Sequence, residues 1–302
     1  MSSNTTQILP EPRIPYGYVP TEAVCIAFLT LFAVSGLIHT FQAIKYRTWW
    51  MIATLTVGCL GECIGWAGRL WSSRNPTLLD PFLMQITTTI ISPSFMSAAN
   101  FTILGFIIRT VGQQYSRLSP RWYLIIFIFL DLVSLIVQAI GGARASAAAQ
   151  NQQDADPGGR IMLYGIVLQM IALTIYCILG AEVLIRYYTN KPVRALPEQH
   201  DESVETLDEK KSDGRVALDR NNKLMLLALV ITTVFLFVRA IYRTIELNDG
   251  WDGSIITNQN LFNWLDGMPI TVVTYTFNIL HPGYLLFRRR SGADTPAALS
   301  KA

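Results

Sequence analysis

The chain has 302 residues, of which 51% are hydrophobic and only 15% are charged, and its mean hydropathy is +0.34. A soluble domain carries charges on about a quarter of its residues, so this composition excludes an ordinary soluble protein. The net charge of +3 is small, and it gives no indication of a nucleic-acid partner.

The apolar residues are gathered into runs that are long enough to cross a bilayer, which takes about 20 residues of helix. In lipid every backbone amide needs a partner inside the protein, so such runs form helices. The alternating pattern that is typical of barrel strands is absent from the sequence. The sequence therefore predicts an all-α membrane protein, a seven-helix bundle with spans at 19–44, 49–71, 82–109, 121–143, 161–187, 223–246 and 262–287.

Three segments fall outside the predicted membrane domain or interrupt it. Residues 1–18 form an N-terminal tail, and residues 289–302 form a C-terminal tail. The domain between them, 19–288, contains one polar stretch at 189–222 that mixes both charge signs and holds two prolines. Such a composition is typical of a flexible loop, which we place on the cytoplasmic side.

Basic residues set the expected orientation of the bundle. If the N-terminus lies outside, 17 of the 24 Lys and Arg residues fall on the cytoplasmic side. Cytoplasmic segments of membrane proteins carry this excess of positive charge. The sequence therefore predicts an extracellular or lumenal N-terminus and a cytoplasmic C-terminus.

The cysteines do not indicate a metal site. All four fall within apolar spans, where we expect packing roles and no structural disulfide: Cys25, Cys59, Cys63 and Cys177. Cys59 and Cys63 are four residues apart, but two thiols in lipid without histidine partners make a poor metal site. No glycine-rich phosphate loop follows a strand pattern either. We expect no metal and no other cofactor.

Polar and charged side chains recur inside or at the ends of four predicted spans, where they are costly and usually face other helices. Spacings of three, four and seven residues place most members of each set on one face of their helix. We take ten of them as candidate substrate-binding residues: Glu62, Arg69, Asp131, Ser134, Gln138, Arg144, Arg239, Arg243, Glu246 and Asp266.

Glycines accompany these side chains. Gly58 and Gly65 share the helix face of Glu62, where small residues let another helix approach closely. In the fourth span we expect Gly141 and Gly142 to thin or break the helix near the outer surface. Arg144 would then cap the cluster.

Two interpretations of the candidate residues stay open. With the N-terminus outside, they lie in the outer half of the membrane, with Asp131 near its middle. Four arginines then face three nearby carboxylates, with Asp131 a fourth, so the cluster is close to neutral. One interpretation is a network that only holds the helices together, in which Glu62 forms an ion pair with Arg239 or Arg243.

The other interpretation is a polar cavity that opens outward. Arginine binds phosphate and carboxylate through two parallel hydrogen bonds, so the cavity would take an anionic or zwitterionic head group. Eight polar groups that converge from four helices are more than packing requires, and this favours the cavity.

Several motifs occur together along the chain: Glu62 with Gly65 and Arg69; Pro93 with Ala98; Asp131, Ser134, Gln138, Gly141 and Gly142; Gly165 with Gln169; Arg239-x-x-Tyr242-Arg243-x-x-Glu246; Asp266 with Met268-Pro269; and His281-Pro282-Gly283. In these motifs the chain resembles the fungal lipid-translocating exporters, which are RTA-like seven-helix membrane proteins. The resemblance implies a protein of the plasma membrane or of internal membranes. It also implies export or translocation of sphingoid bases, porphyrins and other amphipathic molecules, with resistance to toxic lipids.

Other classes of membrane protein fit less well. A seven-helix receptor shares the topology, but the sequence has no pair of outside cysteines and no Asn-Pro-x-x-Tyr motif in the last span. An intramembrane metal hydrolase needs several histidines, and the spans hold only His39 and His281, with Asp131 as a further donor. An ATP-driven pump needs a nucleotide site, and no motif for one is present.

The sequence therefore predicts a non-enzymatic translocator or exporter of amphipathic lipids that is not driven by ATP. Its expected partners are membrane lipids or other amphipathic small molecules. Asp131, Glu62 and His281 are the candidate groups for coupling to protons. A lipid-binding sensor that signals through the 189–222 loop stays open as the alternative.

Overall fold

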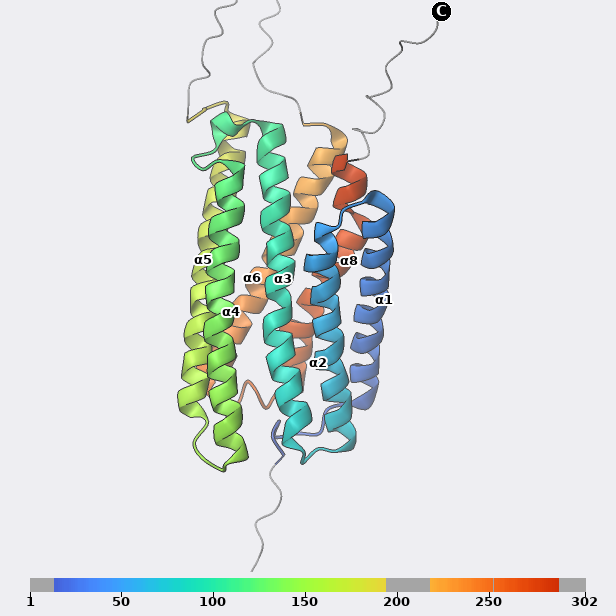
Figure 1. Ribbon diagram of the computed structural model, residues 1–302, viewed down its shortest axis with the longest axis vertical. Coiled ribbons are helices and arrows are strands. Elements are labelled where there is room, and N and C mark those ends of the chain that lie inside the picture. Colours follow the sequence, from blue (N-terminus) through green and yellow to red (C-terminus); the bar gives the residue numbers. More distant parts are fainter. Residues whose placement is uncertain (1–13, 194–217, 252, 288–302) are drawn as a thin grey trace, which may run out of the picture.

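The computed structural model describes residues 14–193, 218–251 and 253–287, and these residues form helices and connecting turns without any strand (Figure 1). The prediction of an all-α fold is confirmed. The predicted tails (1–18 and 289–302) and the loop 189–222 lie wholly or for the most part outside the described residues.

Long helices lie side by side along the bundle (Figure 1). The first six predicted spans correspond to α1 (Glu22–Tyr46), a π-helical turn (Ile52–Thr56) that leads into α2 (Val57–Arg74), α3 (Leu79–Val111), α4 (Pro120–Gln150), α5 (Asp156–Thr189) and α6 (Arg220–Asp249). The last predicted span is built from four pieces: α7 (Gln259–Phe262), a π-helical turn (Asn263–Gly267), α8 (Met268–Ile279) and a second π-helical turn (Gly283–Phe287).

Five of these helices are long and apolar enough to cross a membrane: α1, α3, α4, α5 and α6. The remaining two spans of the prediction are helical but atypical. Helix α2 carries Glu62, Arg69 and Arg74 within 18 residues, and α8 has only 12 residues. The chain is an integral multi-pass membrane protein; the count of seven spans and the outside N-terminus stay predictions.

Local sequence explains where the longest helices begin and end. Helix α4 starts at Pro120, whose fixed φ suits the first turn of a helix. Helix α5 ends before Asn190, which takes the left-handed conformation with φ of 53°. Asparagine tolerates this conformation better than most residues, so it terminates the helix at low cost.

Helices α2 and α3 pack closely through the glycines of α2. A Cβ atom at Gly65 would lie 2.5 Å from Cγ2 of Thr89, and one at Gly68 would lie 2.9 Å from the carbonyl oxygen of Pro81. Any larger residue would push the two backbones apart. The prediction that the glycines around Glu62 allow a close helix contact is confirmed.

Helices α4 and α5 use glycine in the same way. A Cβ atom at Gly165 would lie 2.6 Å from Cγ of Gln138, and one at Gly141 would collide with the backbone of Met162. Helix α4 runs without interruption through Gly141 and Gly142 to Gln150. The expected break is therefore wrong: Gly141 makes room for α5 instead of ending the helix.

Candidate functional site

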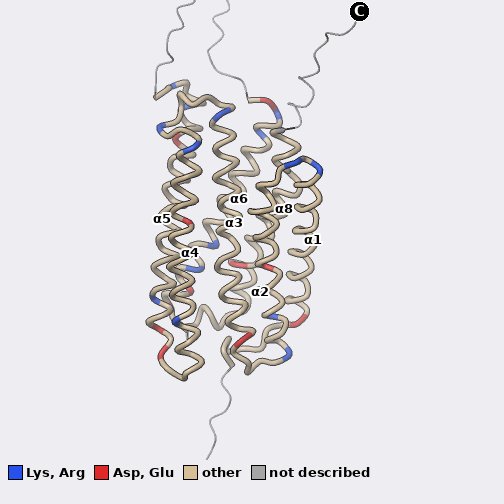
Figure 2. Tube along the Cα trace, viewed as in Figure 1, with Lys and Arg blue, Asp and Glu red and all other residues tan. Residues whose placement is uncertain are grey.

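Charged residues lie at both ends of the bundle and also at mid-depth between the helices (Figure 2). Nine of the ten candidate residues are buried, with exposed fractions of 7% or less: Glu62, Arg69, Asp131, Ser134, Gln138, Arg239, Arg243, Glu246 and Asp266. They come from α2, α4, α6 and the π-helical turn before α8, as predicted.

Arg144 is exposed, so the prediction that it caps the cluster is wrong. The reason is helical phase. An unbroken helix turns by about 100° per residue, which puts position 144 on the far side of α4 from Asp131 and Gln138. Among the described residues the buried cluster therefore holds three guanidinium groups and four carboxylates. With all of them ionised, it is one positive charge short of neutral.

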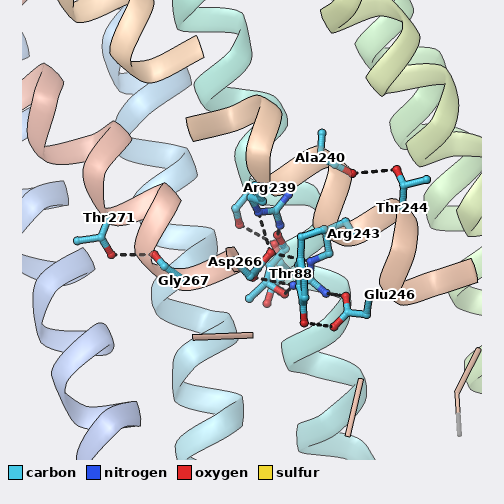
Figure 3. Close-up of polar contacts among 12 residues, drawn as sticks. Thr88, Arg239, Ala240, Arg243, Thr244, Glu246, Asp266, Gly267 and Thr271 are labelled. Atoms are coloured by element: carbon cyan, nitrogen blue, oxygen red, sulfur yellow. Dashed lines mark hydrogen bonds and ion pairs between the residues drawn. The ribbon is translucent and has the colours of Figure 1, made fainter. Parts of the chain in front are cut away.

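Arg243 is the centre of the paired charges (Figure 3). Its Nε and Nη2 atoms donate to the two carboxylate oxygens of Asp266, at 2.7 and 2.8 Å. Its Nη1 atom donates to Oε2 of Glu246 at 2.7 Å, and Nε of Arg239 lies 2.9 Å from Oδ1 of Asp266. A two-pronged pair fixes geometry as well as charge, so Asp266 ties the π-helical turn Asn263–Gly267 to α6.

The spacing of the α6 residues explains this network. Arg239, Arg243 and Glu246 follow each other by four and three residues, so they share one face of the helix. Tyr242 adds a further bond, because its hydroxyl donates to Oε1 of Glu246 at 2.9 Å. The prediction that these three charged side chains point the same way is confirmed.

Helix α3 contributes Thr89, which is not among the residues selected from the sequence. Its carbonyl oxygen accepts a hydrogen bond from Nη2 of Arg239, and its hydroxyl accepts one from Nη2 of Arg243 at 3.0 Å. Both arginines of α6 are therefore held by α3 as well as by Asp266.

Arg69 is held by aromatic rings. Its guanidinium carbon lies 4.2 Å from the ring centroid of Phe262, 5.0 Å from that of Tyr16, 5.5 Å from that of Tyr18 and 5.7 Å from that of Trp66. Its Nη2 atom donates to the hydroxyl of Tyr18. No carboxylate of the described residues lies within 4.0 Å of Arg69, so ring faces take the place of a counter-ion.

The two tyrosines come from the segment that precedes α1. Burial raises the pKa of Tyr16 to about 12, against the opposing effect of Arg69, so this phenol stays protonated. Its hydroxyl donates to Oε1 of Gln85 at 3.0 Å. The predicted N-terminal tail thus includes residues that complete the surroundings of a buried arginine.

Glu62 has no ion pair, which corrects the prediction that it pairs with Arg239 or Arg243. It is 1% exposed, yet no basic nitrogen of the described residues lies within 4.0 Å of its carboxylate, and Oε1 has no hydrogen-bond partner. Asp266, brought in by the π-helical turn, binds both arginines instead. Periodicity placed Glu62 on the correct face of α2, but it does not give the distance between two helices.

The polar face of α4 contacts α5 and α3. Nε2 of Gln138 donates to Gln169 at 3.1 Å, and Gln169 in turn donates to the hydroxyl of Ser94 at 2.8 Å. Ser134 donates to the carbonyl oxygen of Leu130 in its own helix, at 2.8 Å. Asp131 is 5% exposed and has no basic partner within 4.0 Å among the described residues.

A cavity of about 30 Å³ lies between α3, α4, α5 and α6. The polar lining residues are Asp131, Gln138, Gln169, Arg239, Arg243 and Ser97. The other lining residues are apolar and include Pro93, Phe101, Leu173 and Leu236. Oδ2 of Asp131 and Oε1 of Gln138 have no hydrogen-bond partner among the described residues. A space of about 10–15 Å³ holds one water, so the cavity has room for one or two waters.

The cavity offers hydrogen-bond acceptors to an occupant. The donors of Arg243 are directed to Asp266, Glu246 and Thr89, whereas the open groups of Asp131 and Gln138 are oxygens. The expectation of an anionic or zwitterionic head group depends on arginine binding phosphate or carboxylate through two hydrogen bonds. Arg243 uses its donors within the protein, and Arg239 is held by the carbonyl of Thr89 and by ion-pair contact with Asp266, although its Nε has no hydrogen-bond partner among the described residues. A donor with positive charge would complement the cavity better than a phosphate.

A second polar group lies between α1 and α8, apart from the cavity. His39 Nε2 lies 3.1 Å from the carbonyl oxygen of Thr274, and the Gln42 amide donates to the carbonyl oxygen of Asn278 at 2.8 Å. His281 is buried just beyond the C-terminal end of α8. In the part of the chain that the structure describes, no three metal-binding side chains come together.

Residues 55–289 match the model of a protein family described as RTA1 like protein. The chain belongs to this family. The predicted resemblance is therefore confirmed. The match begins just before α2 and covers all later helices to the end of the described residues.

Curated relatives from Saccharomyces cerevisiae agree with this assignment. The chain is 30% identical over 291 residues to the sphingoid long-chain base transporter RSB1, covering 91% of this chain and 75% of the relative. It is 26% identical to Protein RTA1 (90% and 86% covered) and 21% identical to protoporphyrin uptake protein 1 (87% and 90% covered). Two of these names describe transport or uptake, and none describes an enzyme. No solved structure matches the chain.

Proposed function

We propose that this protein moves amphipathic lipids across the membrane without ATP, and that the polar head of the lipid occupies the cavity between α3, α4, α5 and α6. The single observation that carries the proposal is a buried carboxylate, Asp131, which has no basic partner in the described residues and lines a cavity. A charge at membrane depth is costly and is usually retained for a function. The names of the relatives support transport of such molecules.

Within this proposal the candidate residues have different roles. Asp131 and Gln138 accept hydrogen bonds from the head group. Arg239 and Arg243 form a fixed wall, because Asp266 and Glu246 hold them. The preferred head group is an amine that is protonated at neutral pH, as in a sphingoid base. Phosphate-headed and uncharged amphiphiles bind less well.

The dimensions of the cavity support a transport cycle with a closed state. A space for one or two waters is too small for the whole head of a sphingoid base, which carries hydroxyl groups beside its amine. The described conformation is then the closed one, and the substrate enters when the helices around the cavity separate. Closing around the bound head would exclude water and strengthen its interaction with Asp131.

The protein acts in the plasma membrane and is not an enzyme in this proposal. No nucleotide motif is present in the sequence, so the driving force is the substrate gradient or an ion gradient. Export of toxic amphiphiles from the cell would give the resistance that the family resemblance implies.

Reconstitution tests the proposal directly. Purified protein in liposomes should accelerate the transbilayer movement of a fluorescent long-chain amine over that in empty vesicles. A phosphate-headed analogue with the same chain should move several-fold more slowly. Asp131→Asn, which keeps the side-chain shape, should abolish the acceleration for the amine.

Ser134→Ala is the matched control. Ser134 lies on the same face of α4, but its hydroxyl is used by its own helix, so this variant should retain transport. Tight binding of the amine with no transbilayer movement would contradict transport and leave a lipid sensor as the function. The loop through which such a sensor would signal, 189–222, lies mostly outside the described residues.

A further inference from the structure

An apolar groove of about 230 Å³ lies between α3, α5 and α6. Leu104 of α3, Tyr176, Cys177 and Gly180 of α5, and Leu229 and Val230 of α6 contribute to its lining. Val230 is 47% exposed, and Val234, which also lines the groove, is 53% exposed. These side chains belong to the apolar outer faces of helices that cross the membrane, so the groove opens sideways into the hydrocarbon of the bilayer.

The groove lies next to the cavity along the same three helices. On α5, Leu173 lines the cavity and Tyr176 lines the groove; on α3 the corresponding residues are Phe101 and Leu104. On α6, Leu236 lines the cavity and Thr233 lines the groove. Residues three apart lie on the same helix face, one turn or about 5 Å along the axis, so the two spaces are neighbours in one seam.

An aromatic pair separates the two spaces. The rings of Phe101 and Tyr176 meet edge to face with centroids 4.9 Å apart. The hydroxyl of Tyr176 donates to the carbonyl oxygen of Asn100 at 3.3 Å, which fixes the position of the ring. Displacement of these two side chains would join the cavity to the groove.

We propose that this groove holds the aliphatic chain of the transported amphiphile while its polar head lies in the cavity beside Asp131. The inference rests on the proposed function and adds the site for the apolar part of the substrate. The lining is largely apolar, and the groove lies beside the cavity that Asp131, a carboxylate without a basic partner among the described residues, lines. An occupant that is polar at one end and apolar at the other fits both spaces.

The length of the groove then limits the length of the aliphatic chain that the substrate can carry. From Arg239 to Val230 the α6 helix advances by nine residues, or about 14 Å. Gly180 and Leu184 line the part of the groove that is furthest from the cavity along α5. A larger side chain at Gly180 should therefore shorten the space that is available to the tail.

Gly180→Leu tests this limit. A Cβ atom at Gly180 would lie 3.6 Å from Cδ2 of Leu104, which is ordinary contact, so the first atom of the new side chain fits without a shift and the remaining atoms occupy the groove. In liposomes, amines with the longest chains should lose transport at least five-fold, whereas amines with chains six carbons shorter should keep it. Ala143→Leu adds the same side chain to an exposed position of α4 and should leave the chain-length profile unchanged. Equal loss at all chain lengths, or no change at any, would overturn the proposal.

Labelling of Cys177 measures whether the groove is occupied, independently of transport. It lines the groove and is only partly buried, as is Cys63, whereas Cys25 and Cys59 are fully buried. In a Cys63→Ala background in detergent, at an alkaline pH at which maleimide labels Cys177 in the absence of amine, a long-chain amine should slow the labelling, and a short-chain amine with the same head should not. Protection without transport would retain the groove and reject the proposed function. Transport that depends on Asp131 without protection of Cys177 would reject the groove.

Discussion

Arg239 donates a hydrogen bond to the backbone carbonyl of Thr89, four residues before Pro93. In a regular helix this carbonyl would accept from the amide of residue 93, but proline has no N–H. Pro93 thus leaves an acceptor open on α3, and a side chain of α6 occupies it. Pro93, named from the sequence only as part of a family motif, provides the anchoring point of a buried arginine.

Pro93→Ala should weaken this anchor. The variant restores the amide that competes for the carbonyl oxygen of Thr89, while the helix itself gains regularity. We expect an unfolding temperature in detergent that is unchanged or higher, together with a several-fold lower transport rate. Pro81→Ala serves as the control, because Pro81 lies in the first turn of α3, where no helical donor is missing. Equal transport by Pro93→Ala and the natural protein would contradict the importance of the anchor.

Arg243→Ala should be strongly destabilising. It leaves the carboxylates of Asp266 and Glu246 buried without their main partner, which typically lowers the free energy of unfolding by about 3–5 kcal/mol. Arg74→Ala removes an exposed ion pair with Glu22, which is worth about 0–1 kcal/mol. Folded yield and thermal unfolding in detergent measure the difference. Similar values for the two variants would show that the Arg243 network is not sealed from water.

Glu62→Gln should be tolerated, in contrast to Glu246→Gln. Glu62 is buried without an ion pair, so a neutral amide of the same shape removes an unpaired charge and no partner loses its bond. Glu246 holds both Arg243 and Tyr242, and its replacement weakens two bonds. Thermal unfolding of the two variants should therefore differ, with Glu62→Gln equal to or above the natural protein. A lower unfolding temperature for Glu62→Gln than for Glu246→Gln would contradict the assignment.

Gly165→Ala should lower stability, whereas Gly180→Ala on the same helix should not, because α5 is closely packed at Gly165 and open at Gly180. Its methyl group would lie 2.6 Å from Cγ of Gln138 and 2.9 Å from the carbonyl oxygen of Ser134, and overpacking of this kind costs about 1–3 kcal/mol. Gly180→Ala places the same methyl group 3.6 Å from its nearest neighbour and should not lower stability. Unfolding in detergent compares the two substitutions on one helix. If both were equally stable, α4 and α5 would be less tightly packed than described.

Much of the architecture follows from sequence alone, because lipid permits few solutions to backbone hydrogen bonding. The shared face of Arg239, Arg243 and Glu246 could be predicted from spacing, since it depends on one helix only. The partners of these residues depend on two helices and could not. Thr89 binds partly through its backbone, and a threonine in a helix gives no signal of such a bond.

Two other positions show where periodicity fails. Arg144 was misplaced because the phase of α4 depends on whether Gly141 and Gly142 break the helix, and the contact with α5 decides this. The ring of Phe262 beside Arg69 was missed because an aromatic residue in an apolar span normally indicates packing. One signal was readable: a proline four residues after Thr89 marks an open carbonyl.

The glycine contacts described above also bear on how the bundle moves. Along α4 and α5 the backbones touch at Gly141 and Gly165, and along α2 and α3 they touch at Gly68, so neither pair can slide without collision. Each pair should therefore behave as a rigid body. The seam between α5 and α6 holds the cavity and the groove, and it has no such backbone contact at Gly180. We expect the α4–α5 pair to rock outward as one unit, with its hinges in the connections at either end, and spin labels on α4 and α5 to keep a constant separation while both move away from α6.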